Sequence, residues 1–290
     1  MSSIKLTKLP GISHIELPLI KPTPNKFKGS HILPIQWFVM SILAKRRSGK
    51  TTLIYNLIKK FTNKQTIVIM FASTVNKDPV YKAILEYLDE KGINHLSHTH
   101  YMDGSNNLLD TYIDMLGEKK DEEKDEEKDE EKEREGPLSR QPQITIPSLQ
   151  FDSNLEQDEL ASKKRKPKKV TPNYLFIFDD LNKDIRHKSI LKLCKNSRHY
   201  KARVILSSQS VTDIHPEAFA QLDYVGIFKS FNDVSLRQIY DRLEPWVSFE
   251  KFMEIYHTIT SENYAFLFMD RNLEQFRSSL NKLVEVQGHA

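Results

Sequence analysis

The feature that most constrains the fold is an apolar run, Trp37–Ala44, followed at once by a basic loop and an amphipathic segment. The run WFVMSILA does not alternate between polar and apolar residues, and it has the length of a strand buried on both faces of a parallel sheet. From Thr51 to Phe61 the apolar residues recur at the three- and four-residue spacing of one helix face. Residues 37–61 therefore predict a strand, a tight loop and a helix in direct succession.

Further apolar runs repeat this pattern along the chain. Strand-like runs occur at residues 66–74, 174–181, 202–210, 223–230 and 263–270, and helical spacing occurs at 79–91, 185–195, 234–243 and 248–258. Alternating strands and helices are typical of an α/β fold, in which a mostly parallel sheet carries helices on both faces. Six strand candidates are enough for one open sheet.

Composition changes abruptly in the middle of the chain. Residues 118–135 contain twelve acidic and six basic side chains in a four-residue repeat, and the Pro-, Gln- and Ser-rich sequence after them ends in the basic run Lys163–Lys169. A compact domain does not hold about fifty structureless residues in its interior, so residues 118–172 are expected to be a disordered, charged insertion. The expected domains are an N-terminal arm at 1–36, the first half of one domain at 37–117, this insertion, and the second half at 173–290.

The charge of the chain is unevenly distributed. The whole chain carries +4, and because residues 118–135 carry −6, the remainder carries about +10. Such a basic surface favours a polyanionic partner, with nucleic acid as the leading candidate. The basic run Lys163–Lys169 fits a nuclear-localisation signal, a DNA contact or a solvated low-complexity segment, and the sequence leaves these three open.

Cysteine content and hydropathy exclude other classes of protein. Cys194 is the only cysteine, which excludes a disulfide framework and a cysteine-based zinc site. Its apolar neighbours predict a core position in a protein of a reducing compartment. No run approaches the ~20 apolar residues of a membrane-spanning helix, and the first residues do not form a signal peptide. We therefore expect a soluble protein with no transmembrane segment.

The loop AKRRSGKTT, Ala44–Thr52, predicts a site for nucleotide phosphates. Loop amides and the positive end of the following helix would hold the phosphates, the Lys50 ammonium would neutralise β/γ oxygens, and the Thr51 hydroxyl would ligate Mg²⁺. Ala44 replaces the usual first glycine, which costs little if its φ is negative. The side chains of Lys45, Arg46 and Arg47 are expected to point outward. The expected nucleotide-binding residues are Ala44, Lys45, Arg46, Arg47, Ser48, Gly49, Lys50, Thr51 and Thr52.

Polar residues at the ends of two later strands complete the predicted site. YLFIFDDL places Asp179 and Asp180 where a buried strand ends, and ILSSQS places Gln209 at the end of the next strand. Open α/β sheets bind ligands at this edge. Asp179 is suited to the Mg²⁺ shell, Asp180 to polarising an attacking water, and Gln209 to contacting that water or the γ-phosphate. As alternatives, the two aspartates could only cap a helix, and Gln209 could be an ordinary surface residue.

The ordered motifs resemble a known family. AKRRSGKTT, FASTVNKDPVY, YLFIFDDL and NSRHYKARVILSSQS together are similar to the genome-packaging ATPases of poxviruses, other large DNA viruses and virophages, within the FtsK/HerA superfamily. The resemblance implies a RecA-like P-loop NTPase fold of the additional-strand type. It also implies ATP and Mg²⁺ as ligands, Asp180 as catalytic base and Gln209 as sensor.

The resemblance further implies how such a protein works. It implies a homo-oligomeric ring, a hexamer by analogy, that translocates double-stranded DNA into a capsid in the virion and the host-cell cytoplasm, with a capsid or portal component as a further partner. Arg198 in SRHY is the candidate for acting on a neighbouring subunit's nucleotide or on DNA. Residues 218–222 lack an arginine found in similar proteins, so Arg237, Arg242 and Arg271 remain alternatives for the trans-acting role.

Two other functions are compatible with a phosphate loop. A P-loop kinase would transfer phosphate to a small acceptor, but it needs an arginine-rich lid and does not need paired carboxylates with a sensor glutamine. An inactive P-loop scaffold would bind DNA or capsid protein without hydrolysis, and the presence of Lys50, Thr51, Asp179 and Asp180 disfavours it. The long charged insertion is not typical of the packaging family, and its role stays open.

Overall fold

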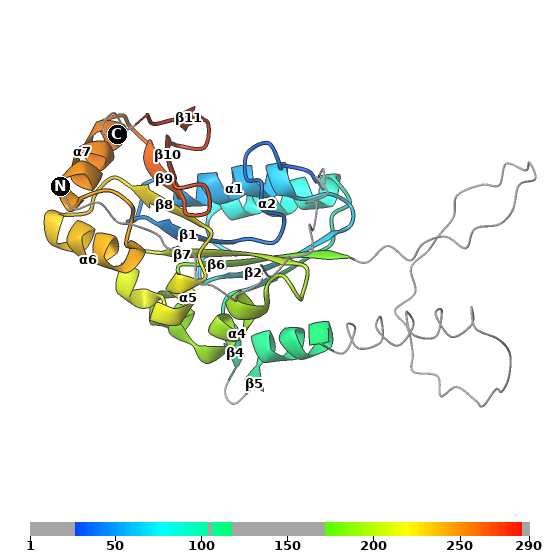
Figure 1. Ribbon diagram of the computed structural model, residues 1–290. Coiled ribbons are helices and arrows are strands. Elements are labelled where there is room, and N and C mark those ends of the chain that lie inside the picture. Colours follow the sequence, from blue (N-terminus) through cyan, green and yellow to red (C-terminus); the bar gives the residue numbers. More distant parts are fainter. Residues whose placement is uncertain (1–26, 104–105, 118–171, 286–290) are drawn as a thin grey trace, which may run out of the picture.

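The computed structural model describes residues 27–103, 106–117 and 172–285 (Figure 1). The first 26 residues of the expected N-terminal arm lie outside the described residues. So do nearly all of the expected insertion and the basic run Lys163–Lys169.

The described residues form a sheet of nine strands in the order β11-β10-β9-β8-β1-β7-β6-β2-β3, with β4 and β5 paired separately. From β8 to β3 all neighbours run parallel, whereas β9, β10 and β11 pair antiparallel. The sheet is therefore mostly parallel, as predicted. The strands are β1 Val39–Leu43, β2 Thr66–Ala72, β3 His95–His98, β4 Met102–Asp103, β5 Asn106–Asn107, β6 Asn173–Asp179, β7 Ala202–Ser208, β8 Tyr224–Phe228, β9 Phe266–Asp270, β10 Gln275–Ser278 and β11 Lys282–Leu283.

Helices cover both faces of the sheet (Figure 1). The α-helices are α1 Lys50–Phe61, α2 Pro79–Glu90, α4 Lys188–Asn196, α5 Pro216–Ala220, α6 Asp233–Leu243 and α7 Phe249–Thr260, and residues 108–117 are also helical. The 3₁₀ turns are η1 Asn182–Arg186 and η2 Val211–Asp213. Helices α1 and α2 share one core cluster with the sheet, while residues 108–117, α4, α5, α6 and α7 share the other.

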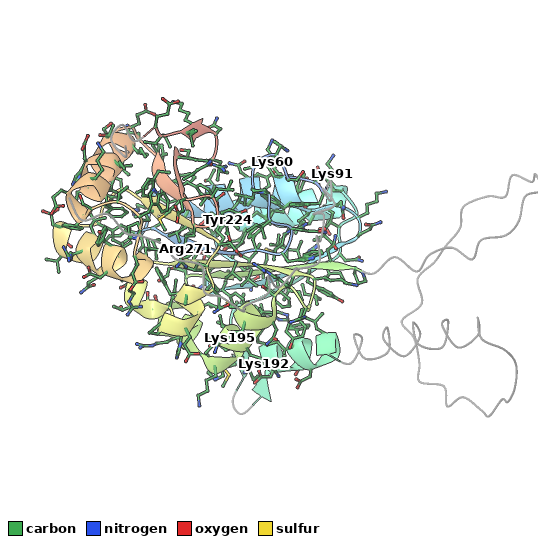
Figure 2. All side chains as sticks on the ribbon, in the orientation of Figure 1. Lys60, Lys91, Lys192, Lys195, Tyr224 and Arg271 are labelled. Carbon is green, nitrogen blue, oxygen red and sulfur yellow. The ribbon has the colours of Figure 1, made fainter. Side chains whose placement is uncertain are left out.

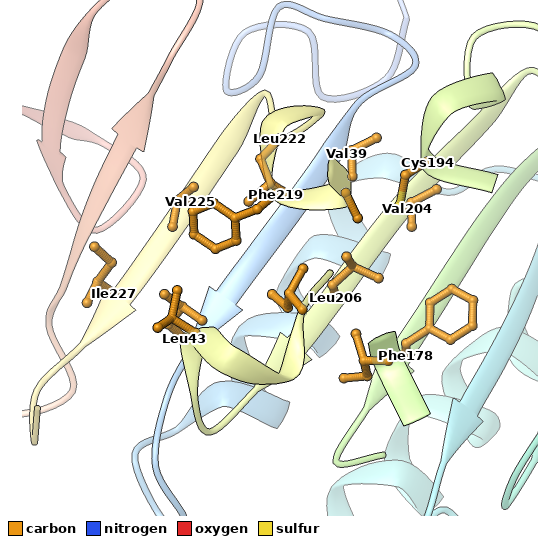
Figure 3. Packing of buried hydrophobic residues seen from close by; sticks show 14 of the residues in the cluster. Val39, Leu43, Phe178, Cys194, Val204, Leu206, Phe219, Leu222, Val225 and Ile227 are labelled. Carbon is orange, nitrogen blue, oxygen red and sulfur yellow. The ribbon is translucent and has the colours of Figure 1, made fainter. Parts of the chain in front are cut away.

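Alternate residues of each strand enter the two cores, as the period of a strand requires. In β1, Met40 and Ile42 pack toward α1, while Val39 and Leu43 pack toward α5. Figure 3 shows Val39 and Leu43 together with Val204, Leu206 and Phe219 in the second core. Because both faces are covered, the strands are apolar almost throughout, which is why the sequence runs show no alternation.

The strand order fixes the fold class. Strand β7 lies between β1, which leads into the loop Ala44–Gly49, and β6, which ends in Asp179. A strand inserted between these two is the additional strand of the predicted P-loop NTPase type, so the expected fold is confirmed. The six predicted strands and five predicted helices are present, with ends that shift by a few residues.

Some elements have no counterpart in the prediction. Strand β3, HLSH, is polar and half exposed at the sheet edge, so the sequence contains no apolar run that would predict it. Strands β10 and β11, at the opposite edge, and the five-residue helix α5 were also missed. Cys194 is buried as predicted, and burial raises the pKa of its thiol to about 12. Within the described ranges, no helix is long and apolar enough to cross a bilayer.

Residues 27–36, the described part of the arm, pack against the domain. Leu33 is fully buried, and the Arg203 guanidinium donates to the carbonyls of Gln36 and Phe61 at 2.9 Å each. Arg203 also lies 5.2 Å from the ring centroid of Trp37 and 5.9 Å from that of Phe61. Its burial lowers the pKa of the guanidinium to about 10, so hydrogen bonds and ring faces hold a cation in the protein interior.

Candidate nucleotide-binding site

The predicted site residues meet at one edge of the sheet because β1, β6 and β7 run parallel and end there. The amide of Ala44, just after β1, donates to the carbonyl of Ser208 at the end of β7 at 2.9 Å. A pocket of about 550 Å³ opens at this edge. Its lining residues are Arg46, Arg47, Gly49, Lys50, Thr51, Thr52, Thr74, Asp78, Val80, Asp179, Asp180 and Tyr264.

The loop between β1 and α1 contains two residues whose backbone is left-handed. Ala44 is buried and is not among the residues with positive φ, which agrees with the condition set for an alanine at this position. Arg47 has φ 61° and Gly49 has φ 94°. Left-handed residues within such a loop turn successive backbone N–H groups toward one concave side, which is a recurring way to bind anions. Gly49 takes its conformation freely, whereas Arg47 holds it at a cost in backbone energy.

Helix α1 begins in this loop without a cap. Its first turn holds no acidic residue, and Gly49 provides no side-chain hydrogen bond. Helices α2, α4, α5, α6 and α7 each have a side chain that accepts from a first-turn amide. The first amides of a helix need an acceptor, and its positive end favours an anion. The N-terminus of α1 is thus prepared for a phosphate.

Four of the predicted residues converge beside the loop. The Lys50 ammonium lies 3.0 Å from Oδ1 of Asp180 and 3.2 Å from Oδ1 of Asp179. The side-chain amide of Gln209 donates to the same Oδ1 of Asp180 at 2.5 Å. Lys50 and Asp179 are buried, and the side chain of Asp180 is 20% exposed. The start of α1 and the ends of β6 and β7 thus contribute one connected polar cluster.

Asp180 is an ionised acceptor in this cluster. Burial raises the pKa of its carboxyl, but the hydrogen bonds from Gln209 and Lys50 and the charges of Lys50 and Arg46 outweigh burial and leave the pKa below its usual value. Its backbone is left-handed, with φ 57°, and its carbonyl accepts from the Ser73 hydroxyl at 3.1 Å. A carboxylate of low pKa orients a water molecule by accepting its hydrogen bond and does not retain the proton at neutral pH.

Asp179 has a different environment. Its Oδ2 accepts from the Tyr81 hydroxyl at 2.7 Å, and both side chains are buried. Burial raises the pKa of Tyr81, and the negative charge of Asp179 raises it further, so the hydroxyl stays a donor. The Oδ1 atom of Asp179 is buried and accepts no hydrogen bond, although the Lys50 ammonium is near. A buried carboxylate oxygen that has a cation beside it but accepts no hydrogen bond is suited to a metal ion as ligand.

The residues present suit a magnesium ion that is bound together with phosphate, and they do not suit a metal ion whose ligands all come from the protein. No group of three or more His, Cys, Asp or Glu side chains within the described ranges could hold a metal. Magnesium keeps several waters and binds through one or two protein ligands together with substrate phosphates. Thr51 in the pocket wall and Oδ1 of Asp179, which accepts no hydrogen bond, match that pattern.

The basic triplet behaves differently from the expectation that all three side chains point outward. Arg46 and Arg47 are exposed, but they line the pocket, and Arg46 is near enough to lower the pKa of Asp180. Only Lys45 turns away, with its ammonium 5.9 Å from the ring centroid of Phe231. Two of the three cations therefore face the space that phosphates would fill.

The structure does not bring Arg198 to this pocket. Arg198 lies in the turn before β7, at the opposite edge of the sheet from Gln209, and is 71% exposed. Its guanidinium is 3.7 Å from Asp223. A role for Arg198 on a neighbouring subunit stays a prediction.

The three alternative arginines have partners within the chain. Arg242 donates to the carbonyls of Val211 and Ile214, and Arg271 donates to two carbonyls at Phe219 and Leu222. Arg237 pairs with Asp241 and lies over the Phe249 ring.

Several residues in and beside the pocket have no role in the sequence prediction. Tyr81, Ser73 and Asp78 lie in FASTVNKDPVY, a motif whose resemblance assigns no role to single residues. Tyr264 was placed inside a predicted strand, whereas β9 begins at Phe266 and Tyr264 lies in the preceding turn. No signal in the sequence distinguishes Tyr264 from a core aromatic residue.

Comparison with known proteins gives partial matches. No family model matches the chain. Protein 075L of Invertebrate iridescent virus 6, which is uncharacterized, is 30% identical over 106 residues; the match covers 36% of this chain, and the chain spans only 41% of that protein's length.

Among solved structures, the genome packaging NTPase B204 of Sulfolobus turreted icosahedral virus 2 with ATP-gammaS has a TM-score of 0.46 and 15% identity, covering 84% of this chain and 98% of that one. EssC, ATPases 2 and 3, from Geobacillus thermodenitrificans has a TM-score of 0.46 and 11% identity, covering 87% of this chain and 41% of that one. At these identities the chemistry of the site rests on this chain's own residues.

Proposed function

We propose that this chain is an ATP-hydrolysing motor that translocates double-stranded DNA, with packaging of a viral genome into a capsid as its task. The observation that carries the proposal is the convergence of Lys50, Asp179, Asp180 and Gln209 beside an uncapped helix N-terminus, at the edge where three adjacent parallel strands end. The arrangement provides cations and amides for phosphates and a carboxylate for water at the same edge.

Each residue then has a defined task in hydrolysis. The amides at the start of α1 and the Lys50 ammonium bind the β/γ-phosphates, and Arg46 and Arg47 add positive charge at the pocket wall. Thr51 and Asp179 are the residues to hold magnesium, which would neutralise phosphate charge when bound. Asp180 accepts a hydrogen bond from the attacking water and positions it, while Gln209 orients Asp180 and contacts the γ-phosphate.

Charge supports a DNA partner. No acidic residue occurs between Asp184 and Asp213, and α4 within this segment exposes Lys188, Lys192 and Lys195 along one helix face. Figure 2 shows Lys192 and Lys195 on the α4 side of the domain. Lys192 and Lys195 pair with single acidic residues, Asp114 and Glu217. Exposed ion pairs of this kind contribute little, so a phosphate backbone can compete for these lysines.

The decisive experiment measures ATP hydrolysis with and without double-stranded DNA. Hydrolysis is expected in the full chain with magnesium, and DNA is expected to raise its rate. Lys50→Ala should abolish hydrolysis, because the γ-phosphate charge loses its compensating cation. Lys188→Glu with Lys192→Glu should leave basal hydrolysis unchanged and reduce DNA stimulation, with a weaker dependence of DNA affinity on salt.

The outcomes separate the three functions. Hydrolysis that DNA does not change, or that survives Lys50→Ala, contradicts the motor. Transfer of phosphate to a nucleoside or another acceptor supports a P-loop kinase. DNA binding without hydrolysis supports an inactive scaffold. A hexameric ring in solution, measured by mass photometry with DNA and nucleotide, would support the assembly that the resemblance implies, in which Arg198 acts on a neighbour.

A further inference from the structure

The strand order sets the direction in which a nucleotide lies in the pocket. Asp180 and Gln209 follow β6 and β7, which lie on one side of β1. These residues would serve the terminal phosphate, so that phosphate must lie on the β7 side of the loop Ala44–Gly49. The nucleoside at the other end of the molecule then lies on the opposite side of β1, toward β8 and β9.

The antiparallel strand β9 brings an aromatic residue to that side. Strand β9 begins at the edge where the parallel strands end, so the turn before it lies beside the phosphate loop. Tyr264 in this turn lines the pocket, and its Cδ1 is 3.4 Å from the point that a β-carbon on Gly49 would occupy. Tyr264 is the only aromatic residue among the described residues that line this pocket.

Tyr264 is exposed to solvent, and its backbone conformation is energetically unfavourable. Tyr264 is 75% exposed, the highest value among the exposed large hydrophobic residues of the described ranges. Its backbone is left-handed, with φ 62°, which an L-residue with a bulky side chain rarely adopts. In the described part of the chain, its hydroxyl has no hydrogen bond and its ring has no aromatic partner, so neither compensates for this conformation. Strained residues of this kind gather at ligand sites.

We propose that the ring of Tyr264 stacks on the base of the bound nucleotide and forms the base subsite of the pocket. This inference rests on the proposed function, because it takes the direction of the nucleotide from the roles of Asp180 and Gln209. The nucleotide then spans the loop, with its phosphates at Lys50 and its base against Tyr264. Removal of the ring face from water on binding supplies the stabilisation.

The base subsite is expected to discriminate little between bases. Every base has a flat face, and stacking on an aromatic ring is tolerant of base identity. The pocket is therefore expected to bind nucleoside triphosphates of adenine and guanine with affinities within about tenfold of each other.

Calorimetry on the full chain tests the stacking directly. Two probes are titrated in the presence of magnesium: ADP, which has a base, and inorganic tripolyphosphate, which has none. Tyr264→Ala is expected to weaken ADP binding about tenfold and to leave tripolyphosphate binding unchanged, since stacking acts on the base alone. Tyr264→Phe keeps the ring and should bind both probes as the wild type does.

A third variant covers the effect of the backbone. Alanine at positive φ is strained, so Tyr264→Gly, which adopts this conformation freely, is measured alongside and should give the same loss for ADP. Urea unfolding verifies that all variants are folded.

The outcomes distinguish the two proposals. If the wild type binds neither probe, the nucleotide site itself is wrong and the base subsite falls with it. If the wild type binds both probes and Tyr264→Ala and Tyr264→Gly bind ADP equally well, the base lies elsewhere and the inference is wrong. Equal losses for ADP and tripolyphosphate would also overturn the inference, because the ring would then act through the loop and not on the base.

Discussion

The hydroxyl of Tyr81 offers a test of how Asp179 is held. Tyr81→Phe removes one oxygen, which donates to Oδ2 of Asp179 at 2.7 Å. Tyr81 is 0% exposed and Asp179 is 1% exposed, so water cannot replace the lost donor. A hydrogen bond to a charged group contributes about 1.5–3 kcal/mol, and we therefore expect the free energy of unfolding to fall by about 2 kcal/mol.

Urea unfolding of wild type and Tyr81→Phe measures this loss. Tyr87→Phe is the matched control: it is the same substitution in the same helix α2, at a half-buried tyrosine whose hydroxyl has no hydrogen bond within the described structure. Its effect should stay within about 0.5 kcal/mol. Because the pKa of Tyr81 is raised above its unfolded value of 10.0, the contribution is present in full below pH 10 and is lost only as pH rises beyond it. The difference between wild type and Tyr81→Phe should accordingly be constant from pH 6 to pH 9.

A second measurement tests whether the hydrogen bond from Tyr81 to Asp179 is coupled to ligand binding in the nucleotide site. Magnesium and ADP, at saturating concentration, should reduce the difference between wild type and Tyr81→Phe, since a bound cation adds to Lys50 a second partner for the Asp179 carboxylate. Equal stability of Tyr81→Phe and Tyr87→Phe would refute the reasoning, because the bond to Asp179 would then contribute nothing measurable.

Three further substitutions test other parts of the structure. Gly29 has φ 91°, and a β-carbon there would lie 2.4 Å from the Phe61 ring, so Gly29→Ala should cost about 2 kcal/mol or more in urea unfolding, whereas unchanged stability would mean that the arm does not pack as described. Asp180→Asn should differ from wild type by a constant amount above pH 5 and by less as pH falls below the unfolded pKa of 3.8, because the folded pKa is lowered; a difference that grows at low pH would contradict the ion pair. Arg242→Lys loses bonds to two carbonyls and should cost about 1 kcal/mol without slowing hydrolysis by folded protein, and slower DNA-stimulated hydrolysis at unchanged stability would instead assign Arg242 the trans-acting role.

Much of the architecture follows from local sequence because most strands are buried on both faces. WFVMSILA and YLFIFDDL contain enough consecutive apolar residues to be recognised without knowledge of their partners, and both are central strands. Strand β3 cannot be recognised in this way, because its residues are half exposed at an edge of the sheet. There the strand forms by pairing with β2 and not through burial of apolar side chains. Pairing partners are set by the fold as a whole, so no local pattern reveals them.

The candidate site shows the same division. Lys50, Asp179, Asp180 and Gln209 each follow a recognisable strand, so their edge of the sheet could be predicted. Their mutual contacts could not, since these depend on β7 lying between β1 and β6. Tyr264 required knowledge that β9 is antiparallel, because a parallel strand would have placed the same residue at the opposite edge.

The position of β1 in the sheet has a consequence for how the chain folds. Strand β1 pairs with β7 and β8, both of which begin after residue 200, so its two neighbours are synthesised long after β1 itself. About 160 residues separate β1 from β7, and doubling such a separation costs only about 0.6 kcal/mol of closure entropy. Contacts this distant slow folding far more than they reduce stability. The phosphate loop is therefore synthesised before the strands that hold it in place, and a newly made chain should gain nucleotide affinity only after β7 and β8 have joined the sheet.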